Sequence, residues 1–247
     1  MITRRTKALA LAAALAAAGI ARADEPWRIE ATPYLWAAGM KGDAGVGRLA
    51  VDGVETSFTD ITKNLRIGFM GSLEARKGDA GVFFDVVYMK LDVDHAAPAP
   101  FLGDVQARPT QGAYTGAFTC RVSKGPMAVD VFAGVRVNDV KLDLALSSSA
   151  LAPQGRRVVR SRTWTDGFLG ARVEVPLAPR WTFTAYGDVG QGGSDSTWQV
   201  MAGANYTLSP TMVAKFGYRQ VRVDYHRDDF LFDMTSGGLY GGVSAQF

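Results

Sequence analysis

The sequence predicts an all-β chain that closes into one antiparallel, up-and-down barrel of about ten strands. Apolar residues return at every second position in successive runs, and this is the period of a β-strand. Tight and long connections alternate between the runs. After the N-terminal segment, no stretch approaches the roughly 18 consecutive apolar residues expected of a membrane-spanning helix.

The alternation is clearest between Trp181 and Val221, where three runs follow one another. In the first of them Trp181, Phe183 and Val189 share one face, and threonine, tyrosine and aspartate residues share the other. A soluble sandwich would cover its apolar face with a second sheet, whereas a membrane barrel turns that face to lipid and keeps the polar face inside. The aromatic residues on the apolar face favour a transmembrane barrel, because Trp and Tyr collect at membrane interfaces.

Residues 1–23 have the features of a secretory signal peptide. A positively charged start precedes an apolar run from Ala8 to Ile20, and the small residues Ala21 and Ala23 form a cleavage site. The apolar run is shorter than the roughly 20 residues that a helix needs to cross a bilayer. We therefore expect a cleaved signal followed by a single barrel domain over residues 24–247.

Ten runs of this mature chain are predicted to be strands. They cover about residues 27–39, 65–76, 81–93, 110–122, 127–146, 158–175, 181–189, 198–206, 212–225 and 234–247. Four connections are tight, at residues 77–80, 123–126, 176–180 and 208–211. Outer-membrane barrels have short periplasmic turns and longer external loops, so both termini are expected in the periplasm. Eight strands would require two of these runs to be loops, and twelve would require a hairpin within residues 40–64.

The last run ends on an aromatic residue. Leu239, Gly241, Val243 and Ala245 alternate towards Phe247. This ending resembles the signal that the outer-membrane assembly machinery reads, so that machinery is an expected partner of the last strand.

The charge balance argues against a nucleic-acid partner, and the cysteine content excludes an internal disulfide. The chain has 27 Lys and Arg and 24 Asp and Glu residues, but four of the bases lie in the signal segment, which leaves 23 against 24. This balance gives no argument for nucleic-acid binding. Cys120 is the single cysteine, so no internal disulfide can form and a lipid-facing or buried thiol is expected. The expected partners are outer-membrane lipids and lipopolysaccharide around a monomeric barrel, with no cofactor and no metal.

Charged residues recur on the face opposite the apolar one, and they are predicted to line the lumen. Seven acids balance seven bases in this set: Arg28, Glu30, Glu74, Arg76, Asp85, Arg121, Asp130, Arg136, Asp166, Arg172, Glu174, Asp188, Lys215 and Arg219. In a narrow interior these charges must pair or be hydrated, because an isolated buried ion costs several kcal/mol. The balance favours a plugged lumen with a structural or surface-interaction role. The alternative is a narrow channel for small solutes or ions.

Both histidines of the chain lie beside aspartates near the outer ends of predicted strands. Asp92 and Asp94 precede His95, and Asp224 precedes His226. These residues resemble the arrangement in omptins, outer-membrane proteases in which an Asp-His pair activates water and an Asp pair faces it. The resemblance covers only these residues. It implies, as a second alternative, a surface hydrolase that uses Asp224 and His226, although we expect no enzymatic activity.

Several short motifs occur in order along the mature chain. They are PYLW at 33–36, GVFFDVVY at 81–88, WTDGFLGAR at 164–172, GDVG at 187–190, GSD at 193–195 followed by WQ at 198–199, and GYR at 217–219. Together they resemble a family of Gram-negative outer-membrane β-barrel proteins. The resemblance implies an outer-membrane location and a barrel fold, and it implies no substrate.

Overall fold

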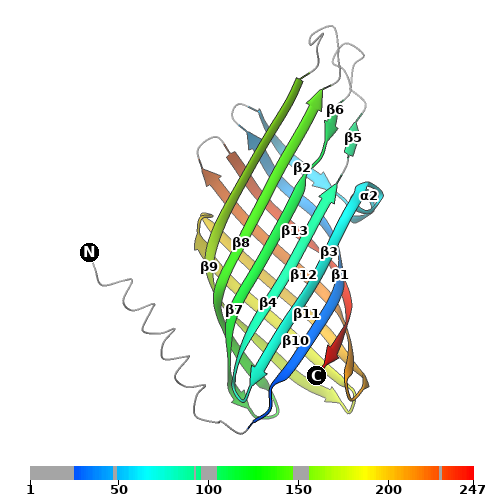
Figure 1. Cartoon of the computed structure of the whole chain (residues 1–247), viewed down its shortest axis with the longest axis vertical. Helices are drawn as coiled ribbons and strands as arrows, with labels where there is room; N and C mark the ends of the chain where they lie inside the picture. The colour runs from blue at the N-terminus through cyan, green and yellow to red at the C-terminus, as the bar shows by residue number, and fades with distance from the viewer. Residues whose placement is uncertain (1–24, 47–48, 92, 96–104, 147–155, 228–229) are drawn as a thin grey trace, which may run out of the picture.

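The chain forms a closed antiparallel barrel of ten long strands in a computed structural model (Figure 1). The structure describes residues 25–46, 49–91, 93–95, 105–146, 156–227 and 230–247. The ten strands are β1 (Arg28–Val46), β3 (Leu65–Lys77), β4 (Ala80–Leu91), β7 (Thr110–Lys124), β8 (Ala128–Leu146), β9 (Arg156–Ala178), β10 (Trp181–Gly192), β11 (Ser196–Ser209), β12 (Met212–Arg227) and β13 (Phe230–Gln246). Each pairs with the next, and β1 pairs with β13 to close the ring. The predicted fold class is confirmed.

Two ends of the barrel differ in their connections, and we call them the turn end and the loop end. The tight connections and the C-terminus lie at the turn end, at the bottom of Figure 1. The predicted signal segment, residues 1–23, lies outside the described residues. No helix within the described ranges is long and apolar enough to span a membrane.

Several strands are longer than the sequence predicted, and β1 extends at the loop end from about residue 39 to Val46. β1 has 19 residues and β9 has 23, whereas about 9–11 residues cross a bilayer in a tilted strand. The loop end also carries β2 (Leu49–Thr56), α2 (Phe58–Asn64), β5 (Val93–His95) and β6 (Val105–Ala107). β2 forms a hairpin with the outer part of β1, so residues 40–64 do contain a hairpin. It extends one strand of the ring and does not make a twelve-stranded barrel.

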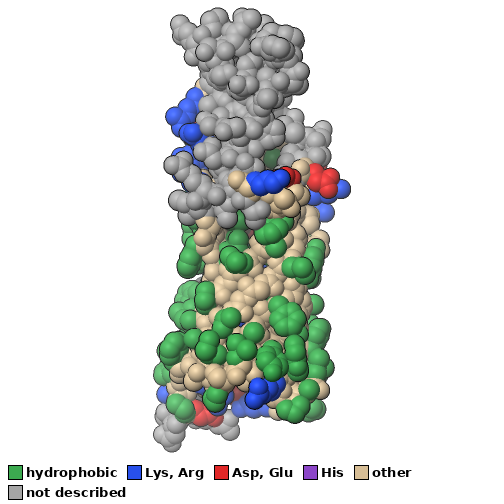
Figure 2. Space-filling model, turned by 90° about the vertical axis from the view of Figure 1, so that its right-hand side faces the viewer, with side chains coloured by type: hydrophobic (Ala, Val, Ile, Leu, Met, Phe, Trp, Pro, Cys, Tyr) green, Lys and Arg blue, Asp and Glu red, His purple; other side chains and the backbone are tan. Residues whose placement is uncertain are grey.

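An apolar outer face covers the wall near the turn end. Leu35, Phe118, Val189 and Leu239 are each about two-thirds exposed or more, as expected for side chains that face lipid. Figure 2 shows hydrophobic side chains spread over one face of the wall, with charged side chains mainly at its upper and lower margins. On β1 this apolar band ends before Lys41, and on β4 it ends before Lys90.

The alternation reverses its polarity where the strands leave this band. In β12, Val223 and Tyr225 are buried inside the barrel, while Arg222, Asp224 and His226 lie on the opposite face. A wall surrounded by lipid turns its apolar face outward, whereas a wall surrounded by water has to turn it inward. The expectation of a polar inner face therefore holds only towards the turn end.

The inner face at the loop end forms an apolar core. Trp164 stacks on Tyr225 with ring centroids 4.2 Å apart. This core has two clusters of buried side chains. The first contains Val140, Trp164, Val223, Tyr225, Phe230, Phe232 and Met234. The second contains Trp36, Ala38, Val87 and Met89. These side chains fill the lumen above the charged residues.

One interface of the ring is much shorter than the rest. The ladder between β1 and β3 joins only Arg28–Pro33 with Gly71–Arg76, which is six residue pairs. The ladder between β10 and β11 contains ten pairs, and that between β8 and β9 contains nineteen.

Candidate functional site

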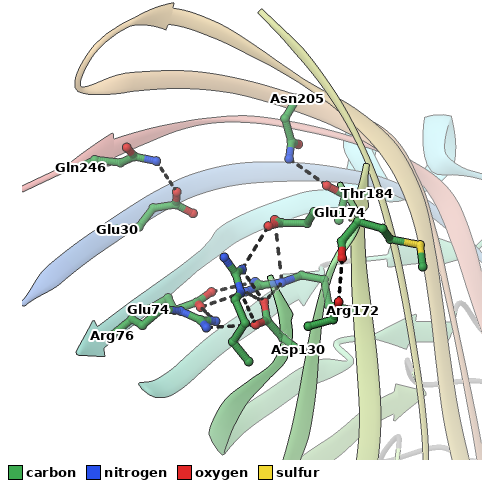
Figure 3. A network of polar contacts seen from close by, with 12 residues as sticks. Glu30, Glu74, Arg76, Asp130, Arg172, Glu174, Thr184, Asn205 and Gln246 are labelled. Carbon is green, nitrogen blue, oxygen red and sulfur yellow. Dashed lines mark hydrogen bonds and ion pairs between the residues drawn. The ribbon is translucent and has the colours of Figure 1, made fainter. Parts of the chain in front are cut away.

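The turn-end half of the lumen is crossed by a group of six charged residues, which we call the ionic cluster. Its members are Glu74, Arg76, Arg121, Asp130, Arg172 and Glu174, which project from β3, β7, β8 and β9 (Figure 3). Asp130 is only 1% exposed. Its carboxylate accepts hydrogen bonds from Arg76 at 2.9 Å, from Arg121 at 2.8 Å and from Arg172 at 2.8 Å. Three guanidinium groups thus offset the cost of burying this carboxylate.

The ionic cluster reaches across the lumen as well as along the wall. Arg172 donates two hydrogen bonds to Glu74, at 2.7 and 2.8 Å. Their strands, β9 and β3, are four positions apart in the ring of ten, so this bidentate pair joins nearly opposite walls. Beside the cluster, Glu30 pairs with Lys215 and accepts a hydrogen bond from Gln246 at 2.9 Å.

A second set of polar side chains crosses the lumen farther from the turn end, and we call it the polar layer. In one half Arg219 donates to Asp85 at 3.1 Å, to the hydroxyl of Tyr34 at 2.7 Å and to Gln199 at 2.8 Å. The Tyr34 hydroxyl donates to Asp85 at 2.6 Å. Because β12 and β4 are also four positions apart, the Arg219–Asp85 pair is a second bridge between opposite walls.

The other half of the polar layer is centred on Arg136. Its guanidinium donates to Asp188 at 2.8 and 3.2 Å, and it lies over the ring of Phe168, 5.1 Å from the centroid. Tyr186 donates to the same carboxylate at 2.7 Å. Arg136 and Asp188 are 3% and 4% exposed, so the pair is shielded from solvent.

A cavity of about 120 Å³ lies between the ionic cluster and the polar layer. Charged residues of both layers line it, together with Thr32, Thr184, Met201, Asn205 and Tyr240. Asn205 donates to Thr184 at 2.8 Å, so part of this lining is already satisfied internally. Since one water molecule needs at least roughly 10–15 Å³ of such volume, the cavity is large enough for several water molecules.

The structure places the remaining predicted lumen charges outside these two layers. Arg28 is exposed at the turn end. Asp166 is 0% exposed and lies next to the apolar core of the loop end. Its Oδ1 accepts a hydrogen bond from the backbone N–H of Ser194 at 2.7 Å, and its Oδ2 has no hydrogen-bond partner among the described residues.

The residues of the hydrolase hypothesis lie in separate parts of the loop end. Asp224 and His226 are on the outer face of β12, opposite the buried Val223 and Tyr225. Asp94 and its neighbour His95 are in β5, which is joined through β6 to β8, and Asp92 lies outside the described residues. β8 and β12 are four positions apart in the ring. No group of three or more metal-ligating residues occurs in the described part of the chain, and the hydrolase remains an untested prediction.

Sequence reasoning missed the uncharged members of the polar layer. Tyr34, Tyr186 and Gln199 lie on inward positions of their strands, but they carry no charge that would mark them as lumen residues. An aromatic hydroxyl on an otherwise polar face was the available signal, because Tyr needs a partner for its O–H when it is buried.

Comparisons with known proteins agree with this architecture. The outer-membrane protease OmpT of Escherichia coli matches with a TM-score of 0.55 and 8% identity, covering 91% of this chain and 98% of that one. The fold is that of a Gram-negative outer-membrane β-barrel. Ail of Yersinia pestis, in complex with the heparin analogue sucrose octasulfate, matches with a TM-score of 0.42 and 12% identity over 90% of this chain and 99% of its own. A FadL homologue of Pseudomonas aeruginosa matches with a TM-score of 0.39 and 9% identity over 91% and 90%.

These likenesses concern the fold alone, because every identity is low. No family model and no curated protein sequence matches the chain. The match to OmpT confirms the predicted resemblance to outer-membrane barrels at the level of fold. Any function has to be argued from the lumen and the wall.

Proposed function

We propose that this protein is an integral outer-membrane barrel with a lumen closed to ions, whose role is structural or lies in surface interactions at its loop end. The observation that carries the proposal is the pair of bridges between opposite walls, Glu74–Arg172 and Asp85–Arg219. Each bridge is a directly bonded ion pair in a narrow lumen. Above them the apolar core of the loop end supplies a third barrier, because an ion entering it would lose its hydration.

The location and the orientation of the barrel belong to the same proposal. The signal-like segment, the apolar band and the short turns all fit export to the outer membrane with the turn end in the periplasm. The reversal of polarity along β12 supports a loop end that stands in water. On this view lipopolysaccharide surrounds the wall, and the assembly machinery binds the last strand during insertion.

Planar-bilayer recording tests the closed lumen. Purified chain that has folded and inserted should give no stepwise increase in ion conductance. Folding and insertion are verified in parallel by a heat-modifiable gel band and by protection from protease. Reproducible conductance steps from the folded chain would contradict the proposal and favour the channel alternative.

A second experiment tests whether the ionic cluster blocks access from the turn end to the cavity. In a Cys120→Ala background, Thr184→Cys places one thiol on the cavity wall. A water-soluble maleimide should label it slowly in the otherwise intact barrel and much faster when Glu74→Ala and Arg172→Ala are added. An Asp143→Ala variant, which removes an exposed ion pair at the loop end, should leave the labelling rate unchanged. Equal rates in all three proteins would show that the cluster is not a barrier.

A further inference from the structure

The short ladder between β1 and β3 leaves a seam in the barrel wall. Beyond the pair Pro33–Gly71, residues 34–39 of β1 have no partner on β3, and residues 65–70 of β3 have none on β1. β1 regains a neighbour on this side at Met40, which pairs with Thr56 of β2. The seam is therefore six residues long on each edge, or about 20 Å at roughly 3.3 Å per residue.

The backbone groups that face the seam can be identified from the pairing. Ile29 exchanges both backbone hydrogen bonds with Phe247, the residue directly after β13. Odd-numbered residues of β1 therefore point their N–H and C=O groups to β13, and even-numbered ones point them to β3. Tyr34, Trp36 and Ala38 consequently direct these groups into the seam. No backbone partner is found for them within the described ranges.

The seam lies within the lipid-facing band. Leu35 on one edge and Phe69 on the other point outward and are 79% and 62% exposed. Lys41 marks the end of the band on β1, so the seam occupies the half of the band nearer the loop end. Unpaired backbone groups in hydrocarbon are strongly unfavourable, and open sheet edges are not left facing lipid. The seam must therefore close or hold molecules that satisfy its edges.

The surface behind the seam is apolar except at its turn-side end, where Tyr34 belongs to the polar layer. Trp36 and Ala38 are buried on the inner side of β1 and pack with Val87 and Met89, and Met70 of β3 packs against the same cluster. The seam thus combines polar edges with an apolar floor. This combination fits a phospholipid, since its acyl chain can contact the floor while its ester carbonyl accepts a hydrogen bond from an N–H group of a strand edge. Water that enters with the headgroup can donate hydrogen bonds to the C=O groups.

We propose that the β1–β3 seam is a lateral binding site for an acyl chain of a lipid in the leaflet next to the loop end. The chain enters the wall between Leu35 and Phe69 and contacts Trp36 and Met70. The two edges keep a matching register, because the six missing pairs would continue the existing ladder without a shift. When no chain is bound, the same residues can pair and close the wall.

Tryptophan quenching by brominated lipid tests this site. Trp36 is made the only tryptophan by changing Trp27, Trp164, Trp181 and Trp198 to Phe, and the full chain is folded into vesicles of phosphatidylcholine with brominated or plain acyl chains. Bromine quenches on close approach, so Trp36 emission should be lost in the brominated vesicles. The reference is a chain whose single tryptophan is introduced by Phe132→Trp, because Phe132 is equally buried and lies on a strand that is paired on both sides within the lipid-facing band. Equal quenching of the two, or no quenching of Trp36, would overturn the proposal.

Two disulfides on the same pair of strands provide a matched control. In a Cys120→Ala background, Leu35→Cys with Phe69→Cys should lock the seam and restore Trp36 emission. Ala31→Cys with Leu73→Cys joins residues that already pair and should change nothing. Quenching that persists in the oxidised seam variant, with the disulfide verified by mass spectrometry, would contradict acyl-chain entry.

A photoreactive acyl chain makes the test independent of the tryptophan substitutions. In the unaltered chain, phosphatidylcholine with a diazirine on its acyl chain should crosslink to the inward residues Trp36 and Met70. The inward residues Thr32 and Ser72, which lie on the paired part of the same strands, should remain free of crosslinks. Crosslinks confined to outward residues would show that the wall is closed to lipid.

Discussion

At the scale of single residues, Asp130 is bonded to more arginines than any other acidic residue in the described part of the chain. It is almost fully buried and accepts hydrogen bonds from three arginines. Without the negative charge of Asp130, the three guanidinium groups would have fewer anionic partners in a part of the lumen that water hardly reaches. The contact pattern therefore assigns Asp130 a stabilising role that its position in the sequence does not reveal.

Replacing Asp130 by asparagine should lower the free energy of unfolding by about 3–5 kcal/mol, the range for removing one partner of a buried ion pair. Urea titration in lipid vesicles, followed by tryptophan fluorescence, measures the change. The comparison variant is Asp143→Asn at the loop end, where a hydrogen bond from the exposed Arg157 lowers the pKa of the carboxyl group. An exposed pair contributes at most about 1 kcal/mol, so equal losses in the two variants would contradict the assignment.

Cys120 lies on the outward face of β7 and can be used to probe whether that face contacts lipid or water. It alternates with the inward Thr119 and Arg121, and it lies next to the exposed Phe118 on the lipid side. A membrane-impermeant maleimide should leave Cys120 unlabelled in folded, vesicle-inserted chain and should label it completely after unfolding in detergent and urea. Rapid labelling of the folded chain would place this thiol in water.

At the scale of elements, one strand can face lipid over part of its length and water over the rest. β8 shows both environments, with Val129 and Val135 on the outer face of the band and the water-facing Asp139 and Lys141 farther along. The inner face changes in the opposite sense, from Asp130 to Val140. Strand β8 thus continues without interruption from a membrane wall into the wall of a water-exposed barrel.

The proposed position of the bilayer along β8 predicts how much an outward-facing arginine destabilises the barrel at each depth. Val135 lies near the middle of β8, so Val135→Arg should lower the free energy of unfolding by roughly 2–4 kcal/mol. Val129 lies near the turn end, so Val129→Arg should lower it by only about 0–1 kcal/mol. Unfolding titrations in vesicles compare the two variants. Equal costs, or a larger cost at Val129, would contradict the proposed position of the bilayer.

The last strand is followed by Phe247, the aromatic residue of the proposed assembly signal. Phe247 is 78% exposed, and its backbone pairs with Ile29 at 3.1 and 2.9 Å. Because its ring makes little contact with the barrel, Phe247→Ala should hardly change the stability of refolded protein. It should nevertheless reduce the amount of folded chain in outer membranes of expressing cells, measured by the heat-modifiable gel band. Unchanged insertion in cells would remove the proposed role of this residue.

At the scale of the whole molecule, alternation was sufficient to predict the strands but not the contacts between them. Period-two runs such as Trp181–Val189 located all ten strands, and the inward parity of Asp85 and Arg219 was correct. Their partnership was out of reach, because the two residues are 134 positions apart and any pairing across the lumen depends on the closed ring. No local pattern states which of many inward acids meets which base.

Two features of the molecule were missed for different reasons. The reversal of polarity is present in the sequence from Gln220 onward, where Arg222, Asp224 and His226 alternate with Val221, Val223 and Tyr225. The period of two continues unbroken through this stretch, so alternation alone predicts a single lipid-facing strand as far as Tyr225. The seam, by contrast, depends on β2 replacing β3 as the neighbour of β1, and a pairing exchange of this kind leaves no periodic trace.

The length of the strands has a consequence for what can reach this protein on a cell. The 23 residues of β9 correspond to roughly 55–60 Å along the barrel axis at about 3.3 Å per residue and a tilt of about 40°. The hydrocarbon zone accounts for only about 25 Å of that height. With the loop end outward, the rim rises past the lipid headgroups into the surrounding saccharide layer. Large molecules in the surrounding medium then reach the rim without entering the lipid.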